Sequence, residues 1–413
     1  MEKIWLKNYQ EGVPENIDPS TYQNIPEVLD NAFKTFGDAP SFHCMGKTLS
    51  YKEIDLLSLK FAAYLQKDLG LKQGERVALM MPNILQYPVA LFGILRAGLV
   101  AVNVNPLYTA RELEHQLKDS DAQAILIFEN SAAILESIIS KTPIKHVLTT
   151  QIGDFLPFPK SLIVNFVIKN VKKMVPAWNL PGSKSFKSAV FESDEKRYSK
   201  PDIGHDDTAF LQYTGGTTGV SKGAELTHRN IVSNMLQAKV WLGDLVEPGK
   251  DIIITPLPLY HIFSLTANCF IFSSLGALNV LITNPRDMPG FVKELKKWKF
   301  TAFTGVNTLF NGLLAQPNIS EVDFSSLKVT LGGGMAVQKA VADKWKKVTG
   351  VPLIEAYGLT ETSPAACINP MNLKDYNGQI GMPISSTELA ILDDDGKELP
   401  VGERGEICIR GPQ

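Results

Sequence analysis

Cysteine is scarce in this chain, and its four cysteines are scattered, with no Cys-x-x-Cys pair among them: Cys44, Cys269, Cys367 and Cys408. Zinc sites and disulfide frameworks depend on numerous or closely spaced cysteines, so we expect neither here. A chain of 413 residues can bury a large core without such crosslinks. Scattered thiols fit a reducing compartment, and the segment from Met1 to Lys7 lacks the apolar run of a signal peptide, so we expect a cytoplasmic location.

An excess of charge of one sign is also missing. Lysine and arginine together number 41 against 43 aspartates and glutamates, which gives a net charge of −2. A nucleic-acid-binding protein usually presents a strongly basic surface, so we expect no nucleic acid partner. Hydrophobic residues make up 44% and charged residues 20%, an ordinary composition for a globular protein, and the length predicts two or three packed units.

One long stretch lacks charge altogether. Residues 252–285 contain no Asp, Glu, Lys or Arg, and a stretch of this length could cross a bilayer. Polar and helix-breaking residues interrupt it, namely Pro256, Pro258, His261, Asn268 and Asn279. Because unpaired backbone groups are too costly in lipid, we predict buried strands and a core helix instead.

A second apolar stretch has positive charge beside it. Between Lys160 and Met174, apolar side chains follow helical spacing, at Leu162, Ile163, Phe166, Val167, Val171 and Met174. Lysines stand at positions 160, 169, 172 and 173. A basic amphipathic helix can lie on an anionic membrane surface. We favour an ordinary surface helix, and we keep a peripheral contact with the inner membrane as the alternative.

Strand and helix patterns alternate through most of the chain. Buried strands are predicted at residues 76–80, 100–104, 124–128, 251–254, 279–282, 302–304, 328–331 and 353–357, and helices at 86–97, 289–297 and 337–348. Ser50-x-x-Glu53 and Thr109-x-x-Glu112 have the pattern of helix capping boxes. We therefore predict an α/β fold with two doubly wound units that meet near residues 150–205. From about residue 386 the pattern changes to short strands, at 388–392 and 406–410.

The strongest signal for function is a loop rich in glycine and hydroxyl groups, which follows a predicted strand at 208–211. It reads Tyr213-Thr214-Gly215-Gly216-Thr217-Thr218-Gly219-Val220-Ser221-Lys222-Gly223. Glycines let several backbone N–H groups converge on one anion, hydroxyl groups add donors, and Lys222 adds a positive charge. We predict that this loop binds polyphosphate. Its spacing differs from G-x-x-x-x-G-K-[ST], and the chain has no G-x-G-x-x-G, which disfavours a P-loop ATPase and a dinucleotide-binding fold.

Two shorter segments also follow predicted strands. In Glu355-Ala356-Tyr357-Gly358-Leu359-Thr360-Glu361, the Tyr357 ring could stack on adenine, and Glu361 is a hard oxygen ligand suited to Mg²⁺. In Gly332-Gly333-Gly334-Met335, the glycines leave room for a flat ligand, although a simple strand-to-helix turn would have the same pattern.

Together, the three segments resemble the adenylate-forming superfamily of acyl-CoA synthetases, luciferases and peptide-synthetase adenylation domains. YTGGTTGVSKG and YGLTE are its most specific motifs, and they stand in the expected order. The stretches RVALMMPN (76–83), NVNPLY (103–108), LPLYHIF (257–263) and TNPRD (283–287) are similar to bacterial long-chain fatty-acid–CoA ligases in particular. The resemblance covers essentially the whole chain.

The resemblance implies an acid–thiol ligase. A fatty carboxylate attacks the α-phosphate of ATP to give acyl-adenylate and pyrophosphate, and coenzyme A then displaces AMP. Fatty acid, ATP and coenzyme A are the implied substrates, Mg²⁺ is the implied cofactor, and a homodimer is expected from the family alone. The charge-free stretch would then line an apolar tunnel, in which each buried methylene contributes about 0.8 kcal/mol.

The family's roles are carried over to the matching positions of this sequence. The residues expected to bind ATP are Tyr213, Thr214, Gly215, Gly216, Thr217, Thr218, Gly219, Lys222, Gly333, Gly334, Glu355, Tyr357, Gly358, Leu359, Thr360 and Glu361. Of these, Thr214, Lys222 and Glu361 would be catalytic, and Glu361 would bind Mg²⁺. The residues expected to bind the acyl substrate are His261, Gly305, Val306, Gly333 and Met335, with an ordinary core histidine as the alternative at position 261.

By the same resemblance, the chain comprises a first α/β subdomain at 75–205, a second at 25–74 and 206–350, and a partial, barrel-like β-rich subdomain at 351–413. Relatives continue with a ribose-binding aspartate, a hinge and a mobile lid that carries an adenylation lysine. We expect a fragment without that lid and without full activity. Two alternatives stay open. One is a fatty-acyl-AMP ligase, which loads a carrier protein, and the other is a non-enzymatic lipid-binding module, which would have no use for Thr214, Lys222 and Glu361.

Overall fold

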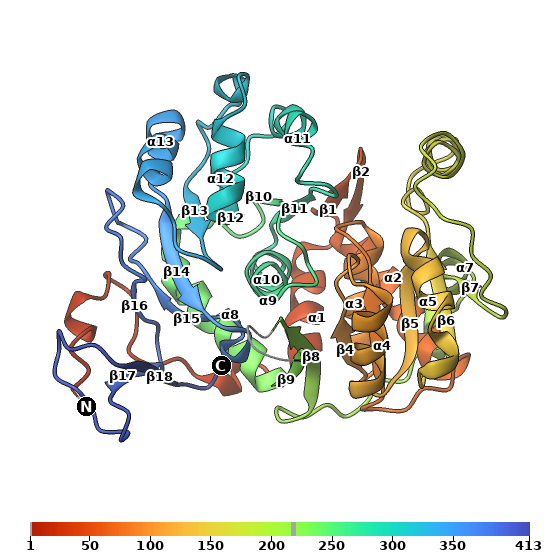
Figure 1. Ribbon diagram of the computed structural model, residues 1–413, viewed down its shortest axis with the longest axis horizontal. Helices are drawn as coiled ribbons and strands as arrows, with labels where there is room; N and C mark the ends of the chain where they lie inside the picture. The colour runs from red at the N-terminus through yellow and green to blue at the C-terminus, as the bar shows by residue number, and fades with distance from the viewer. Residues whose placement is uncertain (1, 216–219) are drawn as a thin grey trace.

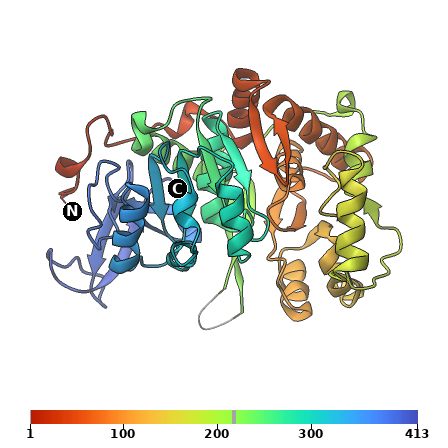
Figure 2. The same cartoon turned by 90° about the horizontal axis from the view of Figure 1, so that it is seen from above.

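Two large and mostly parallel sheets organise the computed structural model, which describes residues 2–215 and 220–413 (Figure 1). Helices pack around both sheets, and the view from above shows the first sheet on one side and the later part of the chain, with the N-terminal segment beside it, on the other (Figure 2). The predicted α/β architecture with two doubly wound units is confirmed.

The first sheet has seven strands in the order β7-β6-β5-β3-β4-β8-β9. Neighbouring strands are parallel except at one edge, where β8 and β9 form an antiparallel pair. The strands are β3 (Arg76–Met80), β4 (Val100–Asn103), β5 (Ala122–Phe128), β6 (His146–Thr150), β7 (Lys184–Ser185), β8 (Thr208–Thr214) and β9 (Lys222–Thr227). Every residue of β5 is buried, as expected for a central strand of a parallel sheet covered on both faces.

The second sheet has nine strands in the order β16-β15-β14-β13-β12-β10-β11-β1-β2. Its six central strands are parallel, and antiparallel strands close both edges. The strands are β1 (Pro40–Cys44), β2 (Lys47–Ser50), β10 (Ile252–Thr255), β11 (Leu278–Leu281), β12 (Ala302–Gly305), β13 (Val329–Gly332), β14 (Ile354–Gly358), β15 (Ala365–Ile368) and β16 (Met382–Pro383). A separate hairpin pairs β17 (Glu388–Leu392) with β18 (Glu406–Arg410).

The α-helices are α1 (Ile25–Phe36), α2 (Tyr51–Lys67), α3 (Gln86–Arg96), α4 (Ala110–Asp119), α5 (Ala132–Glu136), α6 (Lys160–Phe166), α7 (Phe186–Phe191), α8 (His228–Leu242), α9 (Ile262–Ser264), α10 (Phe272–Ser274), α11 (Met288–Leu295), α12 (Asn307–Leu314) and α13 (Lys339–Thr349). Two π-helical segments are η5 (Val167–Val171) and η8 (Leu265–Ile271). Short 3₁₀ turns are η1 (Leu6–Asn8), η2 (Pro19–Thr21), η3 (Glu129–Ser131), η4 (Ile139–Lys141), η6 (Glu195–Arg197), η7 (Gly243–Leu245), η9 (Ile319–Glu321) and η10 (Thr360–Thr362).

Both predicted capping boxes are present. The Glu53 N–H donates to Ser50 Oγ at 3.1 Å, and the Glu53 carboxylate accepts from the Ser50 N–H at 2.7 Å. Thr109 and Glu112 make the same reciprocal pair at the start of α4. These bonds satisfy backbone donors that the first helical turn leaves unpaired, which is why α2 and α4 begin at these positions.

The charge-free stretch folds as predicted. Residues 252–285 form β10, then a continuous helical segment made of α9, η8 and α10, and then β11. All seven residues of η8 are buried. No helix within residues 2–215 and 220–413 is both long and apolar enough to cross a membrane.

The two sheets divide the chain differently from the predicted subdomains. The boundary was expected at residue 205, but β8 and β9 belong to the first sheet, because Phe210 to Gln212 pair with Ala101 to Asn103 of β4. Within 351–413, β14 to β16 extend the second sheet, and the hairpin of β17 and β18 is the part that stands apart.

One continuous hydrophobic core joins the two sheets. The Phe270 ring, from the charge-free stretch, lies 6.1 Å from that of Phe92 on α3 and 6.0 Å from that of Phe210 on β8. The Phe92 ring in turn lies 6.2 Å from that of Phe42 on β1. Because these aromatic contacts link both sheets, the packing fixes how one sheet lies against the other.

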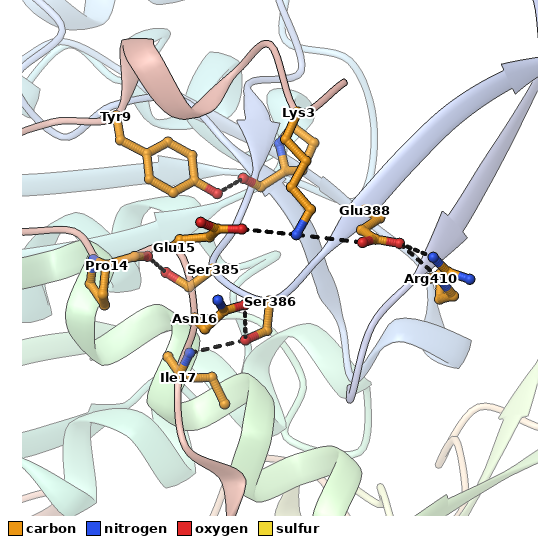
Figure 3. Close-up of polar contacts among 11 residues, drawn as sticks. Lys3, Tyr9, Pro14, Glu15, Asn16, Ile17, Ser385, Ser386, Glu388 and Arg410 are labelled. Carbon is orange, nitrogen blue, oxygen red and sulfur yellow. Dashed lines mark hydrogen bonds and ion pairs between the residues drawn. The ribbon is translucent and has the colours of Figure 1, made fainter. Parts of the chain in front are cut away.

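The N-terminal segment lies against the C-terminal part of the chain (Figure 3). The Tyr9 hydroxyl donates to the Pro383 carbonyl oxygen at 2.6 Å. The Lys3 ammonium lies 3.5 Å from the Glu388 carboxylate of β17. These contacts join segments more than 370 residues apart in sequence and hold the β17–β18 hairpin beside the second sheet.

Candidate active site

The three segments singled out by their sequence meet at one cavity of about 340 Å³. Thr214 reaches it from the end of β8, Gly333 and Gly334 from the turn after β13, and residues 357–361 from the end of β14 and the start of η10. Ligands of open parallel sheets commonly bind at the carboxyl ends of strands, and β12, β13 and β14 all contribute residues from these ends.

Asn234, Thr266 and Thr304 also line the cavity, and most of its remaining lining side chains are apolar. They come from α8, from the charge-free stretch and from β12, β13 and β15, and include Ala238, Trp241, Leu242, Phe263, Ala267, Ile271, Phe272, Phe303, Val329, Leu331 and Ile368. One cavity therefore combines a polar mouth with an apolar interior.

The hairpin of β8 and β9 carries the glycine-threonine loop. Thr214 pairs with Lys222 across the two strands, and Ser221 Oγ donates to the Thr214 carbonyl oxygen at 2.6 Å. These bonds define the base of the loop. Of its predicted phosphate-binding residues, Gly216, Thr217, Thr218 and Gly219 lie outside the described residues.

Tyr213 is anchored elsewhere. Its hydroxyl donates to Asp119 Oδ2 at the end of α4 at 2.6 Å, and burial together with this carboxylate raises the pKa of Tyr213. A Cβ at Gly223, on the neighbouring strand, would lie 2.9 Å from the tyrosine ring. Glycine at 223 thus allows the ring to cross the strand, and Tyr213 fixes the base of the loop to α4.

The turn after β14 requires glycine. A Cβ at Gly358 would overlap the Pro364 carbonyl oxygen, because β14 and β15 pair closely at this position. The Leu359 N–H donates to Thr362 Oγ1 at 2.9 Å and tightens the turn. The chain reverses here, and the reversal puts Tyr357, Thr360 and Glu361 on the same cavity wall.

The glycine turn after β13 forms another crowded part of the wall. A Cβ at Gly333 would lie 3.2 Å from the Phe263 ring and 3.4 Å from the Ala356 carbonyl oxygen. Gly334 has a φ of +76°, a backbone conformation that side chains other than glycine rarely adopt.

His261 borders the cavity, which leaves part of its ring accessible to solvent. Its Nδ1 accepts a hydrogen bond from the Phe263 N–H at 3.3 Å. Protein atoms surround the rest of the ring, and this burial lowers the pKa of His261 below its ordinary value. The neutral imidazole, with Nδ1 as acceptor, carries its proton on Nε2.

Several predicted residues do not line the cavity, namely Tyr213, Gly215, Lys222, Glu355, Gly305, Val306 and Met335. The Glu355 carboxylate is buried and accepts from the Val337 N–H at 3.1 Å, so it supports the turn before α13. Gly305 is covered by the Phe310 ring, 2.8 Å from where its Cβ would stand. These two positions support the walls from behind.

Helix α8 is a wall of the cavity that the sequence analysis missed. Asn234 donates from Nδ2 to the Ala365 carbonyl oxygen at 2.9 Å, and the Trp241 indole N–H donates to Asn369 at 3.0 Å. Both bonds attach α8 to β15 and the chain that follows it. Thr227 and Asn230 form a capping box at the start of α8, a signal in the sequence that could have revealed this helix.

Glu361 is the one carboxylate among the described residues that line the cavity. No cluster of three or more His, Cys, Asp or Glu side chains suited to a metal occurs in residues 2–215 and 220–413. Mg²⁺ is commonly held by one or two carboxylates together with substrate phosphates, so the single exposed carboxylate of Glu361 fits that role.

Comparison with solved structures defines the class of the fold. An anthranilate CoA ligase in complex with anthranoyl-AMP superposes with a TM-score of 0.83 at 23% identity, covering 96% of this chain and 71% of that one. A long-chain-fatty-acid-CoA ligase from Archaeoglobus fulgidus superposes with a TM-score of 0.80 at 25% identity, covering 98% and 77%. The profile of the AMP-binding enzyme family matches residues 29–413, and the chain belongs to this family of adenylate-forming ligases.

Curated relatives are more similar still. The chain is 54% identical over 413 residues to a long-chain-fatty-acid–CoA ligase of Yersinia pestis, covering 100% of this chain and 74% of the relative. It is 35% identical to the Bacillus subtilis long-chain-fatty-acid–CoA ligase, covering 100% and 73%. The resemblance drawn from the sequence motifs is confirmed.

Proposed function

We propose that this chain binds the fatty acid and ATP in a long-chain fatty-acid–CoA ligase, which forms an acyl-adenylate and then a CoA thioester. The observation that carries the proposal is the single cavity in which an apolar interior meets Thr214, His261, Tyr357, Thr360 and Glu361. The names of the relatives at 54% and 35% identity support the same substrate.

The apolar interior suits a long acyl chain. Aromatic and aliphatic side chains from α8 and the charge-free stretch surround it, and none of the lining residues in that part is charged. Each methylene moved from water into such a site contributes about 0.8 kcal/mol, which is about fourfold in affinity. The affinity for acyl chains of different length would therefore depend mainly on the apolar area of the chain that the cavity buries.

The polar mouth suits the reacting groups. Adenylation brings an anionic carboxylate to a polyanionic triphosphate, so positioned hydrogen-bond donors must offset the charge. Thr214 and Thr360 would offer hydroxyl donors, and the neutral His261 would offer Nε2–H to the carboxylate without quenching it by proton transfer. The Tyr357 ring and Gly358 would border the adenine, as the family motif implies.

Mg²⁺ would be held by Glu361 and the phosphates of ATP. When bound, it supplies charge neutralisation and orientation of the phosphate groups. Lys222, on the exposed side of the hairpin, would add positive charge near the loop that precedes it.

A series of non-hydrolysable acyl-adenylate analogues, graded in chain length, tests the proposal by calorimetry. The dissociation constant is expected to fall about fourfold per methylene until the cavity is filled. A series without dependence on length would overturn the long-chain assignment. Competition by ATP separates this proposal from a lipid-binding module. Such a module would bind fatty acid without any response to ATP, and it would bind it equally well in Glu361→Ala.

A substitution that fills part of the cavity tests the proposed position of the acyl chain more sharply. Ala238 of α8 lines the cavity, whereas its neighbour Lys239 is exposed. Ala238→Phe is expected to weaken binding of a long-chain analogue more than about tenfold and of a short-chain analogue less than about threefold, because the ring occupies space that distal methylenes need. Lys239→Phe places the same ring in solvent and is the matched control. Equal losses for both chain lengths would contradict the proposed position of the acyl chain.

A further inference from the structure

The segment from Phe158 to Met174 exposes an unusual share of apolar surface. It comprises α6, the π-helical η5 and their flanks, and it lies at the outer edge of the molecule, in yellow-green in Figure 2. Six of the sixteen exposed large hydrophobic residues of the described chain lie in these seventeen positions: Phe158 (81% exposed), Leu162 (61%), Ile163 (58%), Phe166 (60%), Val171 (64%) and Met174 (54%). Concentrated exposure of this kind marks an interaction surface.

The other side of the same segment is firmly attached. Asn165 Oδ1 accepts from the Gly153 N–H at 2.8 Å, and the Lys169 ammonium lies 2.9 Å from the buried carboxylate of Glu129. Ser161 is buried. The apolar side chains are therefore held outward on an anchored helix.

The charged side chains that this segment and its flanks carry are all positive. Residues 155–191 contain six lysines and no Asp, Glu or Arg, although the whole chain has a net charge of −2. Lys172 and Lys173, which adjoin the apolar side chains, are both exposed. Any partner of this face must therefore offer negative charge next to an apolar phase.

We propose that the face formed by Phe158, Leu162, Ile163, Phe166, Val171 and Met174, with Lys172 and Lys173 beside it, docks on an anionic lipid surface. A helix with apolar and lysine-rich sides lies in the interface of a membrane, where its apolar side chains enter the acyl boundary and its lysines meet anionic headgroups. A second copy of the chain is the poorer partner, because a symmetric contact would bring the same lysines together.

The use of such docking rests on the proposed function, because long-chain fatty acids partition into membranes and a docked ligase would meet them there. The docking itself depends only on the face. Vesicle binding and acyl-adenylate analogue binding therefore fail independently, and each can be measured on the same protein samples.

Co-sedimentation with vesicles tests the docking. Binding to phosphatidylcholine vesicles that contain a quarter of phosphatidylglycerol is expected to be more than about tenfold stronger than binding to pure phosphatidylcholine vesicles. It is expected to weaken in about 0.5 M salt, because the Debye length there is only a few ångströms and the attraction of lysines to headgroups is screened. Leu162→Ser/Ile163→Ser/Phe166→Ser is expected to lower the partition coefficient more than about tenfold. Its control is Leu56→Ser/Leu107→Ser/Val401→Ser, which removes exposed apolar side chains elsewhere on the surface.

A charge variant keeps the test informative if the triple variant folds poorly. Lys172→Gln/Lys173→Gln is expected to lower the partition coefficient about fivefold per lysine, and the control Lys34→Gln/Lys239→Gln to leave it unchanged. Equal binding to both kinds of vesicle, or binding unaffected by either face variant, would overturn the proposal. So would a dimer in sedimentation that the face variants convert to monomer, because the face would then serve a second copy.

Discussion

Two apolar stretches of this chain differ in burial. Residues 252–285 contain no charge and form β10, the turn of α9, η8 and α10, and β11, where the side chains of η8 are buried. Residues 158–174 are also rich in apolar side chains, yet six of these are more than half exposed. The first stretch enters and leaves through strands of the second sheet and is enclosed, whereas the second is a short helix attached along one side, with Lys172 and Lys173 exposed beside it.

The comparison shows that apolar content alone does not decide burial. What surrounds a segment decides it, together with the charges that the segment carries. The enclosed stretch supplies the wall of the cavity, and the exposed stretch supplies the proposed lipid-docking face.

The largest expected difference concerns stability. Phe270 lies in the enclosed stretch, is fully buried and contacts the rings of Phe92 and Phe210. Phe270→Ala is expected to lower the free energy of unfolding by about 4 kcal/mol, because it leaves a cavity in the core shared by the two sheets. Phe166→Ala, in the exposed stretch, is expected to change it by no more than about 0.5 kcal/mol. Urea denaturation compares the two, and similar losses would break the distinction.

The second difference concerns acid. His228, at the start of the cavity helix α8, is buried and accepts from the Ile25 N–H, and burial lowers its pKa from 6.5 to about 4. The unfolded chain therefore takes up a proton first as the pH falls, so stability is lost from about pH 6.5 and the loss is complete near pH 4, at about 3 kcal/mol in total.

His228→Gln, which keeps a hydrogen-bond acceptor, is expected to remove this part of the acid-dependent loss in thermal melts between pH 7 and pH 4. Residues 155–191 contain no Asp, Glu or His, so vesicle binding is expected to stay constant from pH 7 to about pH 5.5. An identical pH slope in wild type and His228→Gln would show that this histidine is not the group responsible.

The smallest expected effect concerns the cavity wall itself. Gly333→Ala would place a Cβ 3.2 Å from the Phe263 ring, so the ring must shift by a few tenths of an ångström. Affinity for an acyl-adenylate analogue is expected to fall about fivefold, with a loss of stability of about 1 kcal/mol. Gly204→Ala meets no atom within 4 Å at a backbone conformation open to alanine, and it should change neither quantity. Wild-type affinity and stability in Gly333→Ala would show that the cavity wall accommodates the added Cβ without cost.

Much of the local structure could be predicted. The strands from Arg76 and Val100 and the capping boxes at Ser50 and Thr109 appear where their patterns indicate. Hydrophobic spacing and capping bonds involve neighbours within a turn or two, so short stretches of sequence carry them.

The site was predictable in part. Thr214, His261, Gly333, Tyr357 and Glu361 meet at one cavity, as the family motifs implied. Their neighbours in the same motifs behave differently, because tertiary contacts hold them elsewhere, and Tyr213 also points to the opposite face of β8 from the adjacent Thr214. Tyr213 turns to Asp119 and Glu355 to Val337.

The sequence by itself determined many of the elements and their order, the family, and which short segments meet at the cavity, because periodicity, capping and glycine content are properties of consecutive residues. Tertiary structure alone decided that β8 and β9 join the first sheet, that α8 closes the cavity, and that one apolar stretch is enclosed while the other faces outward. These outcomes depend on burial and hydrogen bonds between residues far apart in the chain, such as Asn234 with Ala365, whose energies no local pattern contains.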